Sequence, residues 1–467
     1  MNTNHPPAPA APPSFTRLFW VGVIGCLLVA IIFILRPSPR QNPPLQAGPA
    51  GAAASQMTVT HSGRGLWVAT SERESVPEPH RPAEEIVAEK LSQFARSREE
   101  IVTAMAKQFN VVVPPDVNRF FAAAQTGRWE ETTNLFAAFQ QLRRTTNWPP
   151  GLEKLWPAIM ETYGVAESAH DWPAQQLLDY GNAVLDSLRP GMVYAGGTDE
   201  GRFIPTLLTE TSDGEHHIVL TQNALADGTY LDYLKFRYSD QLAMLTPDES
   251  QSAFQSYLAD AQKRLRHDQD FPDEPKQIRP GEDIQVTDGR VQVSGQIAVM
   301  SINELLLQNL LQKNPDLTFA LQESFPLKSL YAGATTLGPI TELHAGDPAD
   351  ALTPERAAQS LDYWRSTAQT LLADADTASA ARDAYAKLIL GQAGLFMDRN
   401  LSGEAEQAYQ LATSLNPAYP ESVFQYVKLL TDQKRFDEAR QIVQTAALAA
   451  PDNTQFQSLL SNLKQMK

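Results

Sequence analysis

The strongest constraint in the sequence is an internal repeat near its carboxyl end, with an interval of thirty-four residues. Pro417 and Pro451 are separated by this interval. The same offset relates further apolar or small residues: Ile389 with Val423, Leu395 with Leu429, Ala405 with Ala439, Tyr409 with Val443, and Ala412 with Ala446. Small residues where two helices cross, and a proline that closes each unit, are typical of stacked helical hairpins. The sequence therefore predicts an α-solenoid in this region.

The segments AKLILGQAGLFMDRNLSGEAEQAYQLATSLNP and ESVFQYVKLLTDQKRFDEARQIVQTAALAAP resemble two tetratricopeptide repeats. The first unit departs at its turn, where Ser402 stands in the position that Phe436 occupies in the second. Two units alone are too few to bury a continuous core. We therefore expect the flanking helical segments to cap them, giving a repeat region over residues 353–467.

This resemblance implies a protein or peptide partner, because the first helices of such units line a binding groove. The residues that we expect to line this groove are Gln392, Phe396, Tyr426 and Lys428.

An uncharged apolar run, Leu18–Leu35, predicts a single transmembrane helix. Its eighteen residues would span about 27 Å as a helix, close to the thickness of the hydrocarbon core. Residues 1–17 are expected to form a disordered tail and residues 36–82 a Pro- and Ala-rich linker. The only cysteine, Cys26, lies within the run. We expect a membrane location with the soluble part outside the cytoplasm, since that part lacks thiols.

The residues between the linker and the repeats predict two further regions. Apolar residues at helical spacing predict a helical region over residues 83–175, including a helical hairpin around GRWEETTNLFAAF. Residues 176–350 alternate short β-prone runs with helical segments, which predicts a small α/β domain with a mixed sheet. Within it, Ser301 and Glu304 predict a capping box at a helix start. The expected fold is α+β and multidomain.

The turn in YAGGTDEGRF is the most informative stretch of this middle region. Gly196 and Gly201 have phosphate-loop spacing, but Arg202 and Phe203 follow instead of Lys and Ser/Thr. Two interpretations stay open. In one, Asp199, Glu200 and Arg202 hold a ligand such as a sugar hydroxyl or a metal at the carboxyl end of a strand. In the favoured one, the glycines supply positive φ angles and an acidic residue caps the helix.

The surrounding stretch, from LLDYGNAVLDSLRPGMVYAGGTDEGRFIPTLLTE to YLDYLKFRY, also carries a second resemblance. It is similar to the soluble region of bacterial multi-pass membrane proteins related to protein O-mannosyltransferases. The similarity covers roughly residues 176–345. The chain departs in having Thr198 where an acid is expected and in lacking the multi-pass catalytic half. The resemblance implies a cell-envelope location without implying transferase activity.

Other function classes find no support in the sequence. A net charge of −16 argues against a nucleic-acid partner. His216 and His217 are adjacent and cannot share one metal in a strand, so neither a metal nor a cofactor is expected. An aromatic cluster, Tyr230 to Tyr238, is better explained by core packing than by ligand stacking. We expect a membrane-anchored interaction protein and no enzyme, the alternative being an envelope enzyme or carbohydrate-binding module at the GGTDEGR turn.

Overall fold

The computed structural model describes most of the chain beyond the predicted linker. The described residues are 81–145, 148–279, 281–287, 290–322, 325, 327–344 and 352–466. The predicted tail and the predicted membrane segment Leu18–Leu35 lie outside them, as does nearly all of the linker. Within the described ranges, no helix combines the length and the hydrophobicity that crossing a membrane requires.

Five α-helices and one short 3-10 helix form the amino-terminal helical layer. They are α2 (Ala83–Phe109), α3 (Pro115–Gln125), α4 (Trp129–Arg143), η1 (Leu152–Lys154), α5 (Trp156–Asp171) and α6 (Ala174–Leu185). The predicted apolar face of α2 is buried at Val87, Leu91 and Phe94. This face packs against α3 and α5, and α3 with α4 makes the predicted helical hairpin.

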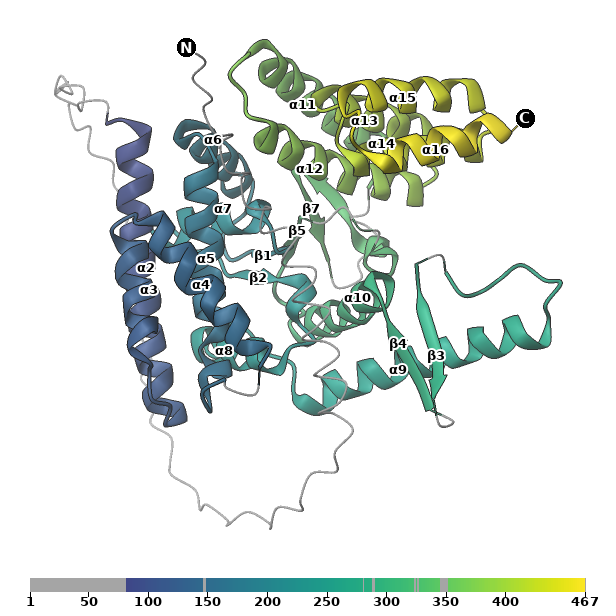
Figure 1. The fold of residues 1–467 in the computed structure, drawn as a ribbon. Helices are drawn as coiled ribbons and strands as arrows, with labels where there is room; N and C mark the ends of the chain where they lie inside the picture. Colours follow the sequence, from purple (N-terminus) through teal and green to yellow (C-terminus); the bar gives the residue numbers. More distant parts are fainter. Residues whose placement is uncertain are drawn as a thin grey trace, which may run out of the picture.

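A five-stranded mixed sheet lies at the centre of the molecule (Figure 1). Its strands are β1 (Val193–Gly196), β2 (Val219–Thr221), β5 (Phe319–Leu321), β6 (Thr335–Leu337) and β7 (Ile340–Leu343). Their order is β2-β1-β5-β7-β6, with β1 parallel to both β2 and β5 and with β7 antiparallel to β5 and β6. Every residue of β1 is buried, as expected for a central parallel strand. The predicted mixed sheet is confirmed.

The connections between the strands contain helices and a separate hairpin. They are α7 (Glu200–Glu210), η2 (Gln222–Ala224), α8 (Gly228–Tyr238), α9 (Pro247–Asp270), β3 (Asp283–Thr287), β4 (Arg290–Ser294), α10 (Gln296–Lys313) and η3 (Lys328–Gly333). Helix α7 joins β1 to β2, forming the expected strand–helix–strand unit. The antiparallel β3–β4 hairpin was also expected.

The predicted capping box at Ser301 is wrong. Helix α10 begins at Gln296, after Gly295 with a φ of 87°. Ser301 therefore lies inside the helix, and Glu304 accepts a hydrogen bond from the backbone N–H of Ser329. A Ser-x-x-Glu pattern is a start signal only where the preceding backbone leaves the helix, and here the glycine provides that break.

The carboxyl-terminal helices confirm the thirty-four-residue repeat. They are α11 (Pro354–Ala373), α12 (Ser379–Asp398), α13 (Ser402–Leu415), α14 (Pro420–Asp432), α15 (Phe436–Ala449) and α16 (Thr454–Gln465). Asn400 and Lys434 lie one repeat apart, and both adopt left-handed backbone angles, with φ of 60° and 62°, in the turns of the two hairpins. Ala405 and Ala439, also one repeat apart, are fully buried where the helices cross.

The repeat region packs directly on the sheet. Helix α12 contacts β7 and α6, while α11 contacts β6. Figure 1 shows α11–α16 gathered at one end of the sheet, with the helical layer α2–α5 on the other side. One hydrophobic core continues through all of these parts.

Candidate functional site

Two of the four predicted groove residues lie on α12 and face the rest of the chain. Gln392 is 1% exposed. Its amide donates to the carbonyls of Gly338 and Ile340, both at 2.9 Å, and accepts from Trp364 Nε1 at 2.9 Å. Phe396 is fully buried. In this structure, the sheet and α11 therefore cover the face of α12 that was expected to line the groove.

The other two predicted groove residues lie on α14. Tyr426 is buried, and its hydroxyl accepts from Gln410 Nε2 at 3.1 Å. Lys428 is exposed to solvent and forms an ion pair with Asp432 at 2.6 Å. The structure thus does not bring the four residues together on one open surface, and Lys428 alone is freely accessible.

Three further side chains connect the repeat region to the sheet domain and to the helical layer. Lys387 on α12 forms an ion pair with Asp199, in the turn between β1 and α7. Arg399, after α12, donates to the backbone carbonyls of Tyr331 and Ala332, both at 2.6 Å. Gln176 on α6 bonds the backbone of the turn before α12, at 2.9 and 3.0 Å. Helix α12 is therefore held at both of its ends and along its length.

The GGTDEGR turn differs from its favoured structural interpretation. Gly196 and Gly201 do not have positive φ angles. They are instead sites of close approach, because a Cβ at Gly196 would lie 2.7 Å from Arg202 Cβ and one at Gly201 would lie 2.3 Å from Gln322 Nε2. Asp199 occupies the N-cap position of α7 without making a side-chain cap hydrogen bond. The glycines thus make room for side chains at the carboxyl end of the sheet.

The three residues of the alternative ligand turn point in different directions. Asp199 bonds Lys387 of the repeat region. Arg202 is turned inward and forms an ion pair with Glu161 of α5 at 2.7 Å. Glu200 is half-buried, and this burial, together with the negative charge of Asp199, raises its pKa to about 7.

Arg202 belongs to a buried charge cluster that joins the helical layer to the sheet domain. Its members are Arg98, Glu161, Arg202, Glu210, Tyr233 and Arg237. Burial alone would raise the pKa of Glu161, but the three guanidinium groups hold it well below its usual range. The tyrosine cluster of α8 also lies in the protein interior. Tyr230, Tyr233 and Tyr238 are buried, which confirms that they pack in the core.

Sequence reasoning missed a set of polar side chains at the carboxyl ends of the parallel strands. Gln222 follows β2 and is fully buried, and Gln322 follows β5 and is 2% exposed. Gln322 Oε1 accepts from the backbone N–H of Gly197 at 3.4 Å, and Asn223 Nδ2 donates to Thr198 Oγ1 at 3.4 Å. A signal was available: both strands, VLT and FAL, are followed directly by glutamine.

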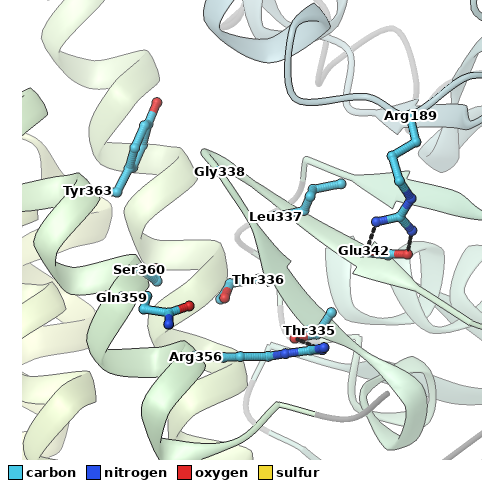
Figure 2. A pocket seen from close by; sticks show the side chains of 10 residues that line it. All are labelled: Arg189, Thr335, Thr336, Leu337, Gly338, Glu342, Arg356, Gln359, Ser360 and Tyr363. Atoms are coloured by element: carbon cyan, nitrogen blue, oxygen red, sulfur yellow. Dashed lines mark hydrogen bonds and ion pairs between the residues drawn. The ribbon is translucent and has the colours of Figure 1, made fainter. Parts of the chain in front are cut away.

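A hollow of about 300 Å³ lies between the edge strand β6 and helix α11 (Figure 2). Arg189 pairs with Glu342 on one side of it, and Arg356 donates to Thr335 Oγ1 at 3.2 Å on another. Tyr363 and Gln359 of α11 line the opposite wall. The hollow is polar and lies where the repeat region meets the sheet.

Metal binding finds no support in the described part of the chain, where no group of three or more His, Cys, Asp or Glu side chains is placed to hold an ion.

Comparison with known proteins finds a family model that matches the carboxyl-terminal part of the chain. Comparison with curated proteins and with solved structures gives no match. Residues 401–463 match the model of the tetratricopeptide repeat. The matched stretch covers α13, α14, α15 and most of α16, which is the second predicted repeat unit with one helix on either side of it; α12 lies outside the match. The carboxyl-terminal helices therefore contain a tetratricopeptide repeat, a module whose general role is to bind other proteins.

Proposed function

We propose that this protein is a membrane-tethered interaction protein of the bacterial cell envelope, which binds a protein or peptide partner through α14 and α16. The observation that carries this proposal is that the first helices of the two expected repeat units, α12 and α14, differ in what covers them. Helix α12 is docked on the sheet through Lys387 and Gln392. Helix α14 instead carries the exposed side chains of Lys428 and Asp432, so a partner can reach it without disturbing the fold.

We define the partner surface as the face of α14 that carries Glu421, Gln425, Lys428 and Asp432. Spacings of four, three and four residues place these side chains along one side of the helix. Lys428 and Asp432 are 74% and 61% exposed. Helix α16 lies beside α14, with the rings of Phe424 and Phe456 5.9 Å apart, and so extends the same surface.

The sequence is the basis for proposing the membrane tether and the cellular location. Leu18–Leu35 has the length and composition of a membrane-spanning helix, and the Pro-rich residues 36–82 would give the folded part reach from the membrane. The soluble part is proposed to lie outside the cytoplasm. Protease treatment of intact and lysed spheroplasts tests this, because residues 81–467 should be cleaved in both; protection in intact spheroplasts would contradict it.

The alternative of an envelope enzyme acting through Asp199, Glu200 and Arg202 is less well supported. Arg202 is 3% exposed and paired with Glu161, so it is not presented to a substrate together with Asp199. The middle region is better explained as the support on which the repeats are mounted.

Partner binding can be tested with two changes that leave α12 docked. The membrane protein that lacks residues 417–467 should no longer capture the partner, whereas the full-length protein should capture it. Lys428→Glu should weaken it, because this change reverses the one positive charge on the partner surface. Gln444→Glu on α15, whose side chain is also exposed, is the matched control and should capture the partner normally. Capture that survives the truncation would refute the proposal.

A further inference from the structure

Strand β3 forms one edge of a two-stranded sheet that is separate from the central sheet. Among the described residues, β4 is the only strand that pairs with it. The pairing is continuous, without a bulge, and β3 contains neither proline nor lysine. Proteins usually protect exposed edges with bulges, prolines or lysines, because a bare edge pairs with strands of other chains. The unprotected edge of β3 therefore indicates a strand partner.

The register of the hairpin determines which backbone groups face this edge. Thr287 pairs with Arg290, and only two residues separate them in the sequence. The pair that closes a two-residue hairpin is hydrogen-bonded, and bonded and non-bonded pairs alternate along an antiparallel ladder. The N–H and C=O groups of Gln285 therefore point towards β4. Those of Ile284 and Val286 point away from β4, where a further strand can bond them.

The hairpin has one apolar face that is only partly covered. Residues opposite each other on paired strands share a face. The apolar face consists of Ile284, Val286, Val291 and Val293. Val293 is 4% exposed, because β4 packs against α9 and α10. Val286, on the edge strand, is 55% exposed. The uncovered part of the apolar face thus lies on the edge strand.

Strand β3 is complementary to a second copy of itself. An antiparallel pair centred on Gln285 places Ile284 of each copy opposite Val286 of the other. The outward N–H and C=O groups of these two residues then meet and can bond. The same alignment packs each exposed Val286 beside an aliphatic side chain. Asp283 lies opposite position 287 of the second copy, so the two acidic residues do not face each other.

We propose that β3 is the contact of a homodimer, in which two hairpins join into one four-stranded antiparallel sheet. A contact around a two-fold axis uses the same patch on both copies and therefore closes on itself. A sheet of three or more strands with an apolar face is also more stable than an isolated hairpin. Figure 1 shows the hairpin on the side of the molecule away from the helical layer α2–α5. Because α14 is not part of this contact, the dimer carries two partner surfaces.

Charge exchange at Gln285 tests the proposal, because this residue faces its own copy across the two-fold axis. Two differently tagged copies of the full-length protein, produced together, should co-purify. Gln285→Lys in both copies, or Gln285→Glu in both, should lower co-purification about threefold or more, since like charges directly opposite are destabilising. Lys in one copy and Glu in the other should restore it. The same changes at Gln292, which is also exposed but lies on β4, are the matched control and should have little effect.

Disulfide crosslinking tests the alignment of the two strands. Residues opposite each other in a non-hydrogen-bonded pair have Cα atoms about 4.5 Å apart, a separation that a disulfide can bridge. In full-length protein with Cys26→Ser, which removes the only cysteine, Gln285→Cys should give a disulfide-linked dimer on mild oxidation. Gln292→Cys should give little. Absence of rescue by the mixed charge variants, or equal crosslinking from positions 285 and 292, would overturn the proposal.

Discussion

Lys387, on helix α12 of the repeat region, forms an ion pair with Asp199, in the turn that follows the central strand β1. The two residues are 188 positions apart in the sequence, and their side chains are 18% and 16% exposed. This contact places helix α12 of the repeat region against the carboxyl end of the central strand β1. It makes the repeat region part of the main body of the molecule.

The coupling between Lys387 and Asp199 can be measured with a double-mutant cycle. We expect Lys387→Met and Asp199→Asn to be coupled by about 1.5–3 kcal/mol, the range for hydrogen bonds to charged groups. The exposed pair Lys428–Asp432 offers a matched control, for which the coupling should be about 0.5 kcal/mol or less. Urea unfolding gives both values. Equal coupling in the two cycles would mean that the docking contact is no stronger than a surface ion pair.

The buried charge cluster should depend on Glu161. Replacing it with Gln removes the carboxylate that faces Arg98 and Arg202 at 2.8 and 2.7 Å. Uncompensated buried guanidinium groups should then lower the free energy of unfolding by about 3–5 kcal/mol. The exposed Glu130→Gln on α4 is the control, with an expected change within about 0.5 kcal/mol. A loss below 1 kcal/mol for Glu161→Gln would contradict this assignment.

Glu200 should make the stability fall as the pH rises from about 4.5 to 7. Its pKa is raised from an ordinary value of 4.5 to about 7. In that window the folded protein keeps a proton that the unfolded chain has released, so the unfolding free energy decreases with increasing pH. Glu200→Gln stays neutral and should lack this component. Denaturation of both proteins across the window checks the prediction, which fails if the two pH profiles are parallel.

Gln392 should be important for stability although it was predicted as a groove residue. Gln392→Leu leaves the indole N–H of Trp364 and the carbonyls of Gly338 and Ile340 without their partner. We expect a loss of about 3 kcal/mol or more, since each unsatisfied buried group costs about 1–3 kcal/mol. Gln441→Leu, at an exposed position of α15, should change stability little. Calorimetry of the two variants decides whether the residue is structural.

Regular, local features of this fold were predictable from the sequence. The thirty-four-residue period places the turns at Asn400 and Lys434, because stacked hairpins need small residues and left-handed turns at fixed intervals. The strand–helix–strand unit was predictable from the change in apolar spacing on either side of α7. The β6–β7 hairpin was not predicted. Its strands have three and four residues, which is too short for an alternating pattern to be distinguished from a loop.

The site residues were harder to predict, because their roles depend on contacts between distant segments. Nothing near Gln392 in the sequence indicates that β7 will cover it. Arg202 follows a glycine turn, yet its partner Glu161 lies on another helix. Gln222 and Gln322 become neighbours of Gly197 only after β2 and β5 pair with β1. Periodicity reports on single elements and contains no information about such encounters.

The central claim is that the repeat region binds a partner through α14 while α12 is held by the sheet. Site-specific photo-crosslinking in intact cells tests it most directly, with the crosslinking residue placed in turn at Lys428 on α14 and at Gln444 on α15. We predict a partner adduct from position 428 and none from position 444. An adduct from position 444 alone, or none from either position while removal of residues 417–467 leaves partner capture intact, would contradict the account.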